Sequence, residues 1–158
     1  MFQVGDKIVH PMHGAGTIDA ITSRRIDGVT REYYVLKLPV GGIQVMVPTE
    51  NCTEIGVRPI LDQTATRQVI EALPGMEVED DSNWNRRYRE NMIRLKSGDL
   101  LQVAQVMKSL MVRDGKRGLS TGERKMLHSA KQILISEIVL VESTSFEEVE
   151  DRINAALA

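Results

Sequence analysis

The order of hydrophobic and polar residues divides the chain into two parts. In the first 56 residues, short segments rich in Val, Ile, Thr and Tyr alternate with turn signals such as Asp27-Gly28 and Gly41-Gly42. Both dipeptides supply positive φ at little cost and favour hairpins. The segments that we predict as strands are Lys7–His10, Gly16–Ser23, Glu32–Leu38 and Ile43–Val47. Four or five short strands are too few for two packed sheets, so the pattern predicts a small, strongly bent barrel of the SH3 or Tudor kind.

From Leu61 onward the pattern has a helical period. The clearest example follows Asp99, where hydrophobic residues recur at the i, i+3, i+4 spacing of a buried helix face. These residues are Leu100, Val103, Ala104, Met107, Leu110 and Met111. The pattern predicts a compact helical bundle after the β domain.

Capping residues indicate where the helices begin. Ser120 and Glu123 have the spacing of a capping box, in which each side chain bonds the backbone N–H of the other residue. Pro74-Gly75 ends the first helix, and the acidic segment Glu77–Ser82 after it predicts a linker. The predicted helix starts are Asp62, Ser82 or Asn83, Asp99, Ser120 and Ser145.

These elements predict an α+β protein in two domains. Residues 1–56 form a small Tudor/SH3-like β-barrel, residues 57–82 form a short helix and the acidic linker, and residues 83–158 form an all-α bundle.

Composition excludes several classes of protein. The chain has 158 residues, 42% of them hydrophobic and 27% charged, which is typical of a globular chain with a buried core. Its most apolar stretch, Ile133–Val141, is interrupted by Ser136-Glu137 and is far shorter than the roughly 20 residues of a membrane span. The N-terminus lacks the pattern of a secretion signal, and a single cysteine, Cys52, cannot form an internal disulfide. We therefore expect a cytoplasmic protein that does not contact membranes.

The net charge of −2 argues against nucleic-acid binding until the charge is divided by segment. Residues 83–131 carry 12 Lys and Arg and 4 Asp and Glu, a net charge of +8. Acidic segments on either side hide this basic block in the total. The block is either a solvated helix surface or a site for a polyanion, and both interpretations stay open.

Candidate catalytic groups are few. His10 and His13 lie close in the sequence, but a zinc site needs three or four ligands and His128 lies in the helical half. Cys52 has no partner of the kind that nucleophilic catalysis requires. We expect a protein that is not an enzyme and that holds no metal and no cofactor.

The segment NWNRRYR at residues 83–89 allows two interpretations. On a helix, Trp84 and Tyr88 share a face with hydrophobic residues that follow, so Trp84 could be the first core residue of that face. It could instead be an exposed aromatic wedge at a helix N-terminus, ringed by arginines that hold phosphates.

Three stretches are specific enough for comparison with known families. They are VGDKIVHPMHGAGTIDAI near the N-terminus, EYYVLKLP followed by VMVPTEN, and NWNRRYREN followed later by RGLSTGERKML. They resemble the CarD/CdnL family of bacterial transcription regulators in the right order over nearly the full chain. The resemblance implies an N-terminal Tudor-like RNA polymerase interaction domain, also found in transcription-repair coupling factors, and a C-terminal helical domain that contacts promoter DNA.

The resemblance also implies a mechanism and a set of residues. The β domain would bind the RNA polymerase β subunit, with Arg24, Met46 and Pro48 at the contact; Met46 stands where characterised relatives carry arginine. The helical domain would stabilise the open promoter complex at the upstream edge of the bubble. There Trp84 matches the family's minor-groove wedge, and Arg86 and Arg89 match positions that contact the DNA backbone. Arg87, Arg124 and Lys125 are further candidates by charge alone.

The resemblance implies a global regulator of transcription that acts as a monomer at many promoters. Its contacts with the DNA would be largely independent of sequence, and it would associate with the nucleoid through RNA polymerase. The alternative is a protein-interaction adaptor without direct DNA contact, in which the basic block binds an acidic partner and Trp84 is core. A self-standing operator-binding repressor is less well supported, because the sequence has no clear helix-turn-helix.

Overall fold

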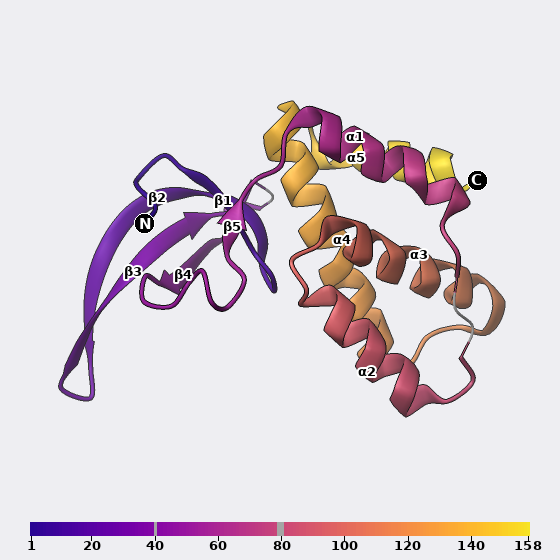
Figure 1. Cartoon of the computed structure of the whole chain (residues 1–158), viewed down its shortest axis with the longest axis horizontal. Helices are drawn as coiled ribbons and strands as arrows, with labels where there is room; N and C mark the ends of the chain where they lie inside the picture. Colours follow the sequence, from indigo (N-terminus) through magenta and orange to yellow (C-terminus); the bar gives the residue numbers. More distant parts are fainter. Residues whose placement is uncertain (40, 79–80) are drawn as a thin grey trace.

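A computed structural model describes residues 1–39, 41–78 and 81–158. A bent β-sheet from the N-terminal part of the chain lies beside a group of helices from the C-terminal part (Figure 1). This arrangement confirms the predicted α+β class and its order along the chain.

The sheet has five antiparallel strands, β1 (Lys7–His10), β2 (Gly14–Ile26), β3 (Val29–Lys37), β4 (Gln44–Pro48) and β5 (Arg58–Pro59), in the order β4-β3-β2-β1-β5. The β2–β3 hairpin turns at Asp27 and Gly28, both with positive φ, as the Asp-Gly signal predicts. On the inner face a small core forms around Tyr34, which is almost completely buried. Its other members are Ile8, Ile18, Leu36, Leu38, Val47, Cys52 and Val57.

Two features of the sheet differ from the sequence prediction. β2 and β3 are longer than predicted, so their hairpin projects beyond the rest of the sheet (Figure 1). Among the described residues, β4 and β5 pair on one side only, so the sheet keeps two edges. The hairpin can extend in this way because side chains beyond Ala20 need no core contact; Ile21, Ile26 and Val29 are exposed there.

The helical part contains α1 (Gln63–Ala72), a 3-10 turn η1 (Leu73–Gly75), α2 (Trp84–Leu95), α3 (Leu100–Arg117), α4 (Thr121–Glu142) and α5 (Phe146–Leu157). Each predicted N-cap is observed, because its side chain accepts a hydrogen bond from a backbone N–H in the first helical turn. The caps are Asp62, Asn83, Asp99, Ser120 and Ser145. The capping box of Ser120 and Glu123 is complete.

A second hydrophobic core joins all five α-helices. The predicted stripe of α3 is at its centre, and Met107 and Leu110 are almost completely buried. Val69, Ile70 and Leu73 also belong to this core, so α1 and η1 pack with the helical bundle. The predicted acidic linker follows; its residues 79 and 80 lie outside the described residues.

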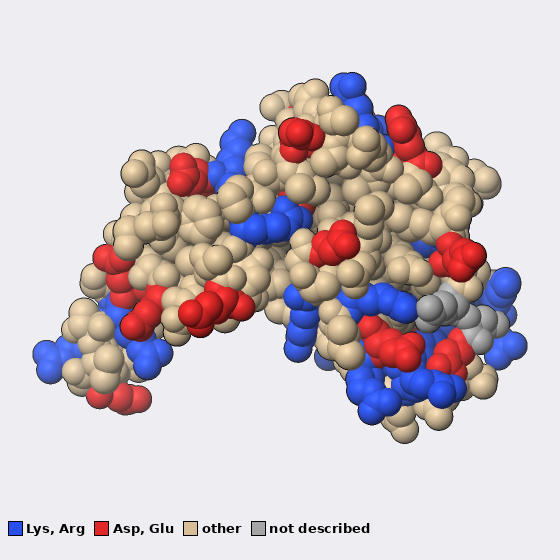
Figure 2. Space-filling model, viewed as in Figure 1, with Lys and Arg blue, Asp and Glu red and all other residues tan. Residues whose placement is uncertain are grey.

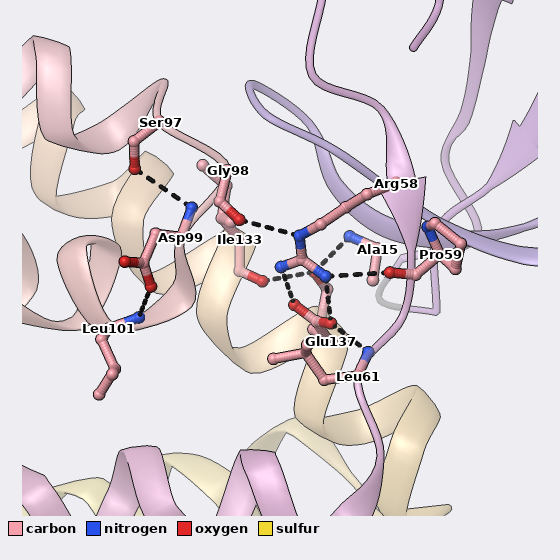
Figure 3. A network of polar contacts seen from close by, with 11 residues as sticks. Ala15, Arg58, Pro59, Leu61, Ser97, Gly98, Asp99, Leu101, Ile133 and Glu137 are labelled. Carbon is pink, nitrogen blue, oxygen red and sulfur yellow. Dashed lines mark hydrogen bonds and ion pairs between the residues drawn. The ribbon is translucent and has the colours of Figure 1, made fainter.

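Polar contacts connect the sheet to α4 and to the turn between α2 and α3 (Figure 3). Glu137 of α4 is completely buried and forms two parallel hydrogen bonds with Arg58 of β5, at 2.7 and 2.8 Å. It also accepts the backbone N–H of Leu61, while Arg58 Nε donates to the carbonyl of Gly98. Ser136 Oγ accepts the N–H of Ala15 at 2.8 Å. The two parts therefore meet in a fixed, hydrogen-bonded junction.

In the described part of the chain, no helix combines the length and the apolar character needed to cross a membrane.

Candidate nucleic-acid interface

Trp84 lies at the first position of α2 and is 43% exposed. Its ring stacks on Tyr88, one turn later, with ring centroids 5.0 Å apart and planes 19° from parallel. Its indole N–H donates to Ser120 Oγ at 3.2 Å. The ring is therefore held by two contacts and still presents much of its surface to solvent, so it is not the core residue of the alternative interpretation.

The N-terminus of α4 packs beside Trp84. A Cβ added to Gly122 would lie 3.3 Å from Tyr88 Cε2 and 4.0 Å from Trp84 Cζ2, so the ring pair closely covers this glycine. Two helix N-termini, those of α2 and α4, thus lie next to the same exposed ring. Free backbone N–H groups and the helix dipoles at such ends favour anions.

Arg87 lies one turn after Trp84 on α2, with its side chain inside the protein. It is 8% exposed, and its guanidinium binds both carboxylate oxygens of Glu123 at 3.0 and 3.3 Å. Its remaining nitrogen donates to the carbonyl of Asp81 at 2.7 Å. Burial alone would raise the pKa of Glu123, but the hydrogen bonds and charge of Arg87 and the hydrogen bonds of Ser120 outweigh it and lower the pKa. Arg87 connects α2, α4 and the end of the linker.

The other basic candidates are exposed. Arg86 and Arg89 lie on α2, and Arg124 and Lys125 lie near the N-terminus of α4. In Figure 2, Lys and Arg side chains gather around the end of the helical part that carries α2, with Asp and Glu among them. These four residues therefore lie on the two helices whose N-termini meet beside Trp84.

Arg86 has a partner that the sequence analysis missed. Its Nε and Nη2 bind the two oxygens of Asp81 at 2.5 and 3.1 Å. The hydrogen bonds from Arg86 and from the N–H of Asn83 lower the pKa of Asp81 to about 2. The acidic character of the segment was visible in the sequence, but no local signal matched this carboxylate to one arginine.

The three predicted polymerase-contacting residues lie on one face of the sheet. Tyr33 pairs with both Thr22 and Pro48, and Val35 pairs with Met46. Because side chains alternate between faces, Arg24, Met46 and Pro48 lie on the face opposite the Tyr34 core. Arg24 and Pro48 are exposed and Met46 is partly buried.

His10 ends β1 and His13 lies in the turn before β2, with the two ring centroids 4.5 Å apart. Burial lowers the pKa of His10 to about 4, with a further contribution from His13, and burial also lowers the pKa of His13. Among the described residues, no group of three or more His, Cys, Asp or Glu side chains could hold a metal ion.

Comparison with known proteins matches each of the two parts of the chain to a family model. The family model described as "CarD-like/TRCF RID domain" matches residues 2–61, and the model described as "CarD, C-terminal domain" matches residues 68–154. The Bacillus subtilis (strain 168) protein "Putative transcription factor YdeB" is 32% identical over 150 residues, which cover 95% of this chain and 98% of that protein. The two models match the sheet and the helical part in the order that the structure shows.

Proposed function

Since this chain belongs to the CarD family of transcription regulators, which interact with RNA polymerase, we propose that it binds the polymerase β subunit and stabilises the open promoter complex. The β domain would supply the polymerase contact, and the helical domain would supply the contact with promoter DNA. The observation that carries the second part is the half-exposed, firmly held ring of Trp84.

The proposed polymerase contact is the outer face of the sheet together with the free edge of β4. Arg24, Met46 and Pro48 lie on this face, and β4 has only β3 as a neighbour among the described strands. An unpaired edge can accept a strand of another protein, and the exposed side chains next to it add specificity. Pro48 lies opposite Tyr33, between the levels of Arg24 and Met46 along the strands, and Met46 would give this contact an apolar element.

The proposed DNA contact centres on Trp84. Minor-groove wedges work by pressing an apolar ring against a base step, which requires an exposed ring whose position is fixed in advance. Tyr88 supports one side of the ring and Ser120 orients its N–H edge. Such a ring at the upstream edge of the bubble would oppose re-pairing of the strands.

Phosphates would be held by the exposed cations of the two helices, Arg86, Arg89, Arg124 and Lys125. We give Arg87 a positioning role instead, because its guanidinium is already bound to Glu123 and to the carbonyl of Asp81. Contacts to the DNA backbone carry little sequence information. The protein would therefore act at many promoters and depend on polymerase for its placement.

The test is the lifetime of open complexes formed with the cognate polymerase and the variant Trp84→Ala. Stacking of an aromatic side chain on a base is worth about 1–3 kcal/mol, so we expect the lifetime to fall by at least about fivefold. Binding to polymerase should not change, because Trp84 lies on α2, away from the sheet.

Ile93→Ala is the matched control, since Ile93 is a 65% exposed hydrophobic residue on the same helix. It should leave the lifetime unchanged. If Trp84→Ala binds polymerase normally and gives a wild-type lifetime, the wedge mechanism is wrong.

A further inference from the structure

The contact between Asp81 and Arg86 joins the acidic linker to a proposed phosphate-binding residue. Both oxygens of the carboxylate face two nitrogens of one guanidinium, side by side. Arginine binds phosphate with the same forked geometry. Asp81 therefore occupies the side of Arg86 that a DNA phosphate would use.

The carboxylate is held in place by more than Arg86. Its Oδ1 accepts the N–H of Asn83 at 2.9 Å, and its backbone carbonyl accepts Arg87 Nη1 at 2.7 Å. Arg87 is in turn held by Glu123. Asp81 thus stays at the start of α2 whether or not Arg86 is bound to it.

The contact can also be opened. The side chain of Arg86 is 57% exposed and that of Asp81 is 20% exposed. Ion pairs in contact with water contribute little stability, because water and salt screen the charges. A phosphate can therefore replace the carboxylate without unfolding α2, whose N-cap is Asn83.

We propose that Asp81 is a built-in competitor of DNA for Arg86, which weakens the binding of promoter DNA by the free protein. This inference rests on the proposed function, in which polymerase brings the helical domain to the promoter. Tethering raises the effective concentration of phosphate near Arg86, so the competition is overcome on polymerase and persists away from it. Asp81 would thereby restrict DNA contact to polymerase-bound molecules.

The test measures binding of the polymerase-free protein to a fluorescently labelled promoter duplex at several salt concentrations. In Asp81→Asn the amide oxygen can still accept the N–H of Asn83, but the negative charge is lost. We expect this variant to bind at least about threefold more tightly than wild type. The slope of log affinity against log salt should become steeper by about 0.9, the value for one additional phosphate contact.

Two controls separate competition from a general charge effect. Asp114→Asn removes one negative charge from an exposed position on α3 and should change affinity by less than Asp81→Asn does. In an Arg86→Gln background, Asp81→Asn should raise affinity no more than Asp114→Asn does, because Asp81 no longer has Arg86 to compete for.

The alternative role for Asp81 is a brace that orients Arg86 toward DNA. If Asp81 were a brace, Asp81→Asn would bind DNA more weakly than wild type, and that result would overturn the proposal. The proposal would also be overturned if Asp81→Asn raised DNA affinity as much in the Arg86→Gln background as in the wild-type background. Asp81→Ser, whose hydroxyl can accept the N–H of Asn83, repeats the test with another side chain. If Arg86→Gln shortens open-complex lifetime but Asp81→Asn gains no affinity, only this inference fails; if Trp84→Ala leaves the lifetime unchanged, the proposed function fails.

Discussion

Lys108 shows how one position in the basic block can have a purely internal role. It lies on α3, is 9% exposed, and its ammonium group donates to the carbonyls of Leu73, Pro74 and Met76 at 2.7, 3.1 and 2.7 Å. These carbonyls end α1 and η1, so the lysine caps them as a charged donor. The sequence places Lys108 in the +8 block, and only the structure shows that its ammonium group binds backbone carbonyls inside the protein.

The histidine pair predicts a pH dependence of stability. The pKa of His10 is about 4 in the folded protein and near 6.5 when the chain is unfolded. In the unfolded state His10 therefore becomes protonated below about pH 6.5, whereas in the folded state it stays neutral down to about pH 4. The contribution of neutral His10 to the free energy of unfolding is therefore fully present above pH 6.5 and is lost as the pH falls from 6.5 to 4.

We expect the Tm of wild type to fall over this range more steeply than that of His10→Asn, measured by thermal unfolding monitored by circular dichroism. Asparagine supplies an oxygen in place of Nδ1, which accepts the N–H of Met12 at 3.0 Å. Parallel curves for the two proteins between pH 6.5 and pH 4 would contradict this assignment.

Among the elements, α2 and α4 depend on each other through one buried ion pair. Arg87 and Glu123 are 8% and 3% exposed as side chains, and Glu123 also completes the capping box of α4. The ion pair fixes the N-terminal ends of both helices and therefore the neighbourhood of Trp84.

Glu123→Gln should lower the free energy of unfolding by about 3 kcal/mol, because it leaves a buried guanidinium without its counter-charge. Urea unfolding followed by circular dichroism measures this loss. Arg152→Gln is the comparison, since Arg152 forms a more exposed pair with Glu142 at 3.1 Å; we expect it to cost about 1 kcal/mol or less. Equal losses in the two variants would show that burial of the Arg87–Glu123 pair adds nothing.

At the scale of the whole molecule, the junction between sheet and helices decides how far the proposed polymerase-contacting face lies from Trp84. Arg58 and Glu137 form its charged centre, and Gly14 packs directly on α4. A partly buried, bidentate pair with three further backbone contacts resists hinge motion better than a solvated linker would. We therefore expect the protein to hold its two contact surfaces at a set separation.

Gly14→Ala tests this junction. An added Cβ would lie 2.5 Å from Ser136 Oγ and 3.1 Å from the carbonyl of Gln132, so the Ser136 side chain or the α4 backbone must shift. Gly28→Ala is the matched control, because Gly28 also has positive φ and no atom within 4 Å of the added Cβ.

Both variants carry the backbone cost of about 1–2 kcal/mol for an L-residue at positive φ. We expect Gly14→Ala to lose a further 1–3 kcal/mol or so in urea unfolding, from overpacking. Losses equal to those of Gly28→Ala would mean that the junction does not depend on this close approach.

The sequence by itself determined the local features. Turn residues such as Asp27-Gly28 and the caps Asn83 and Ser120 act within a few positions of the chain, so they can be located without knowing the fold. The family motifs add the two domains and their order, which the matched residues 2–61 and 68–154 support.

The tertiary structure decided the different roles of side chains that are identical in type. Arg86 and Arg87 are neighbours in the sequence, yet one is exposed and the other is buried against Glu123, 36 positions away. Likewise, the partner of Trp84 is Ser120, and the partner of Arg58 is Glu137. Contacts over such separations depend on how the helices and the sheet pack together, and the local pattern carries no information about that packing.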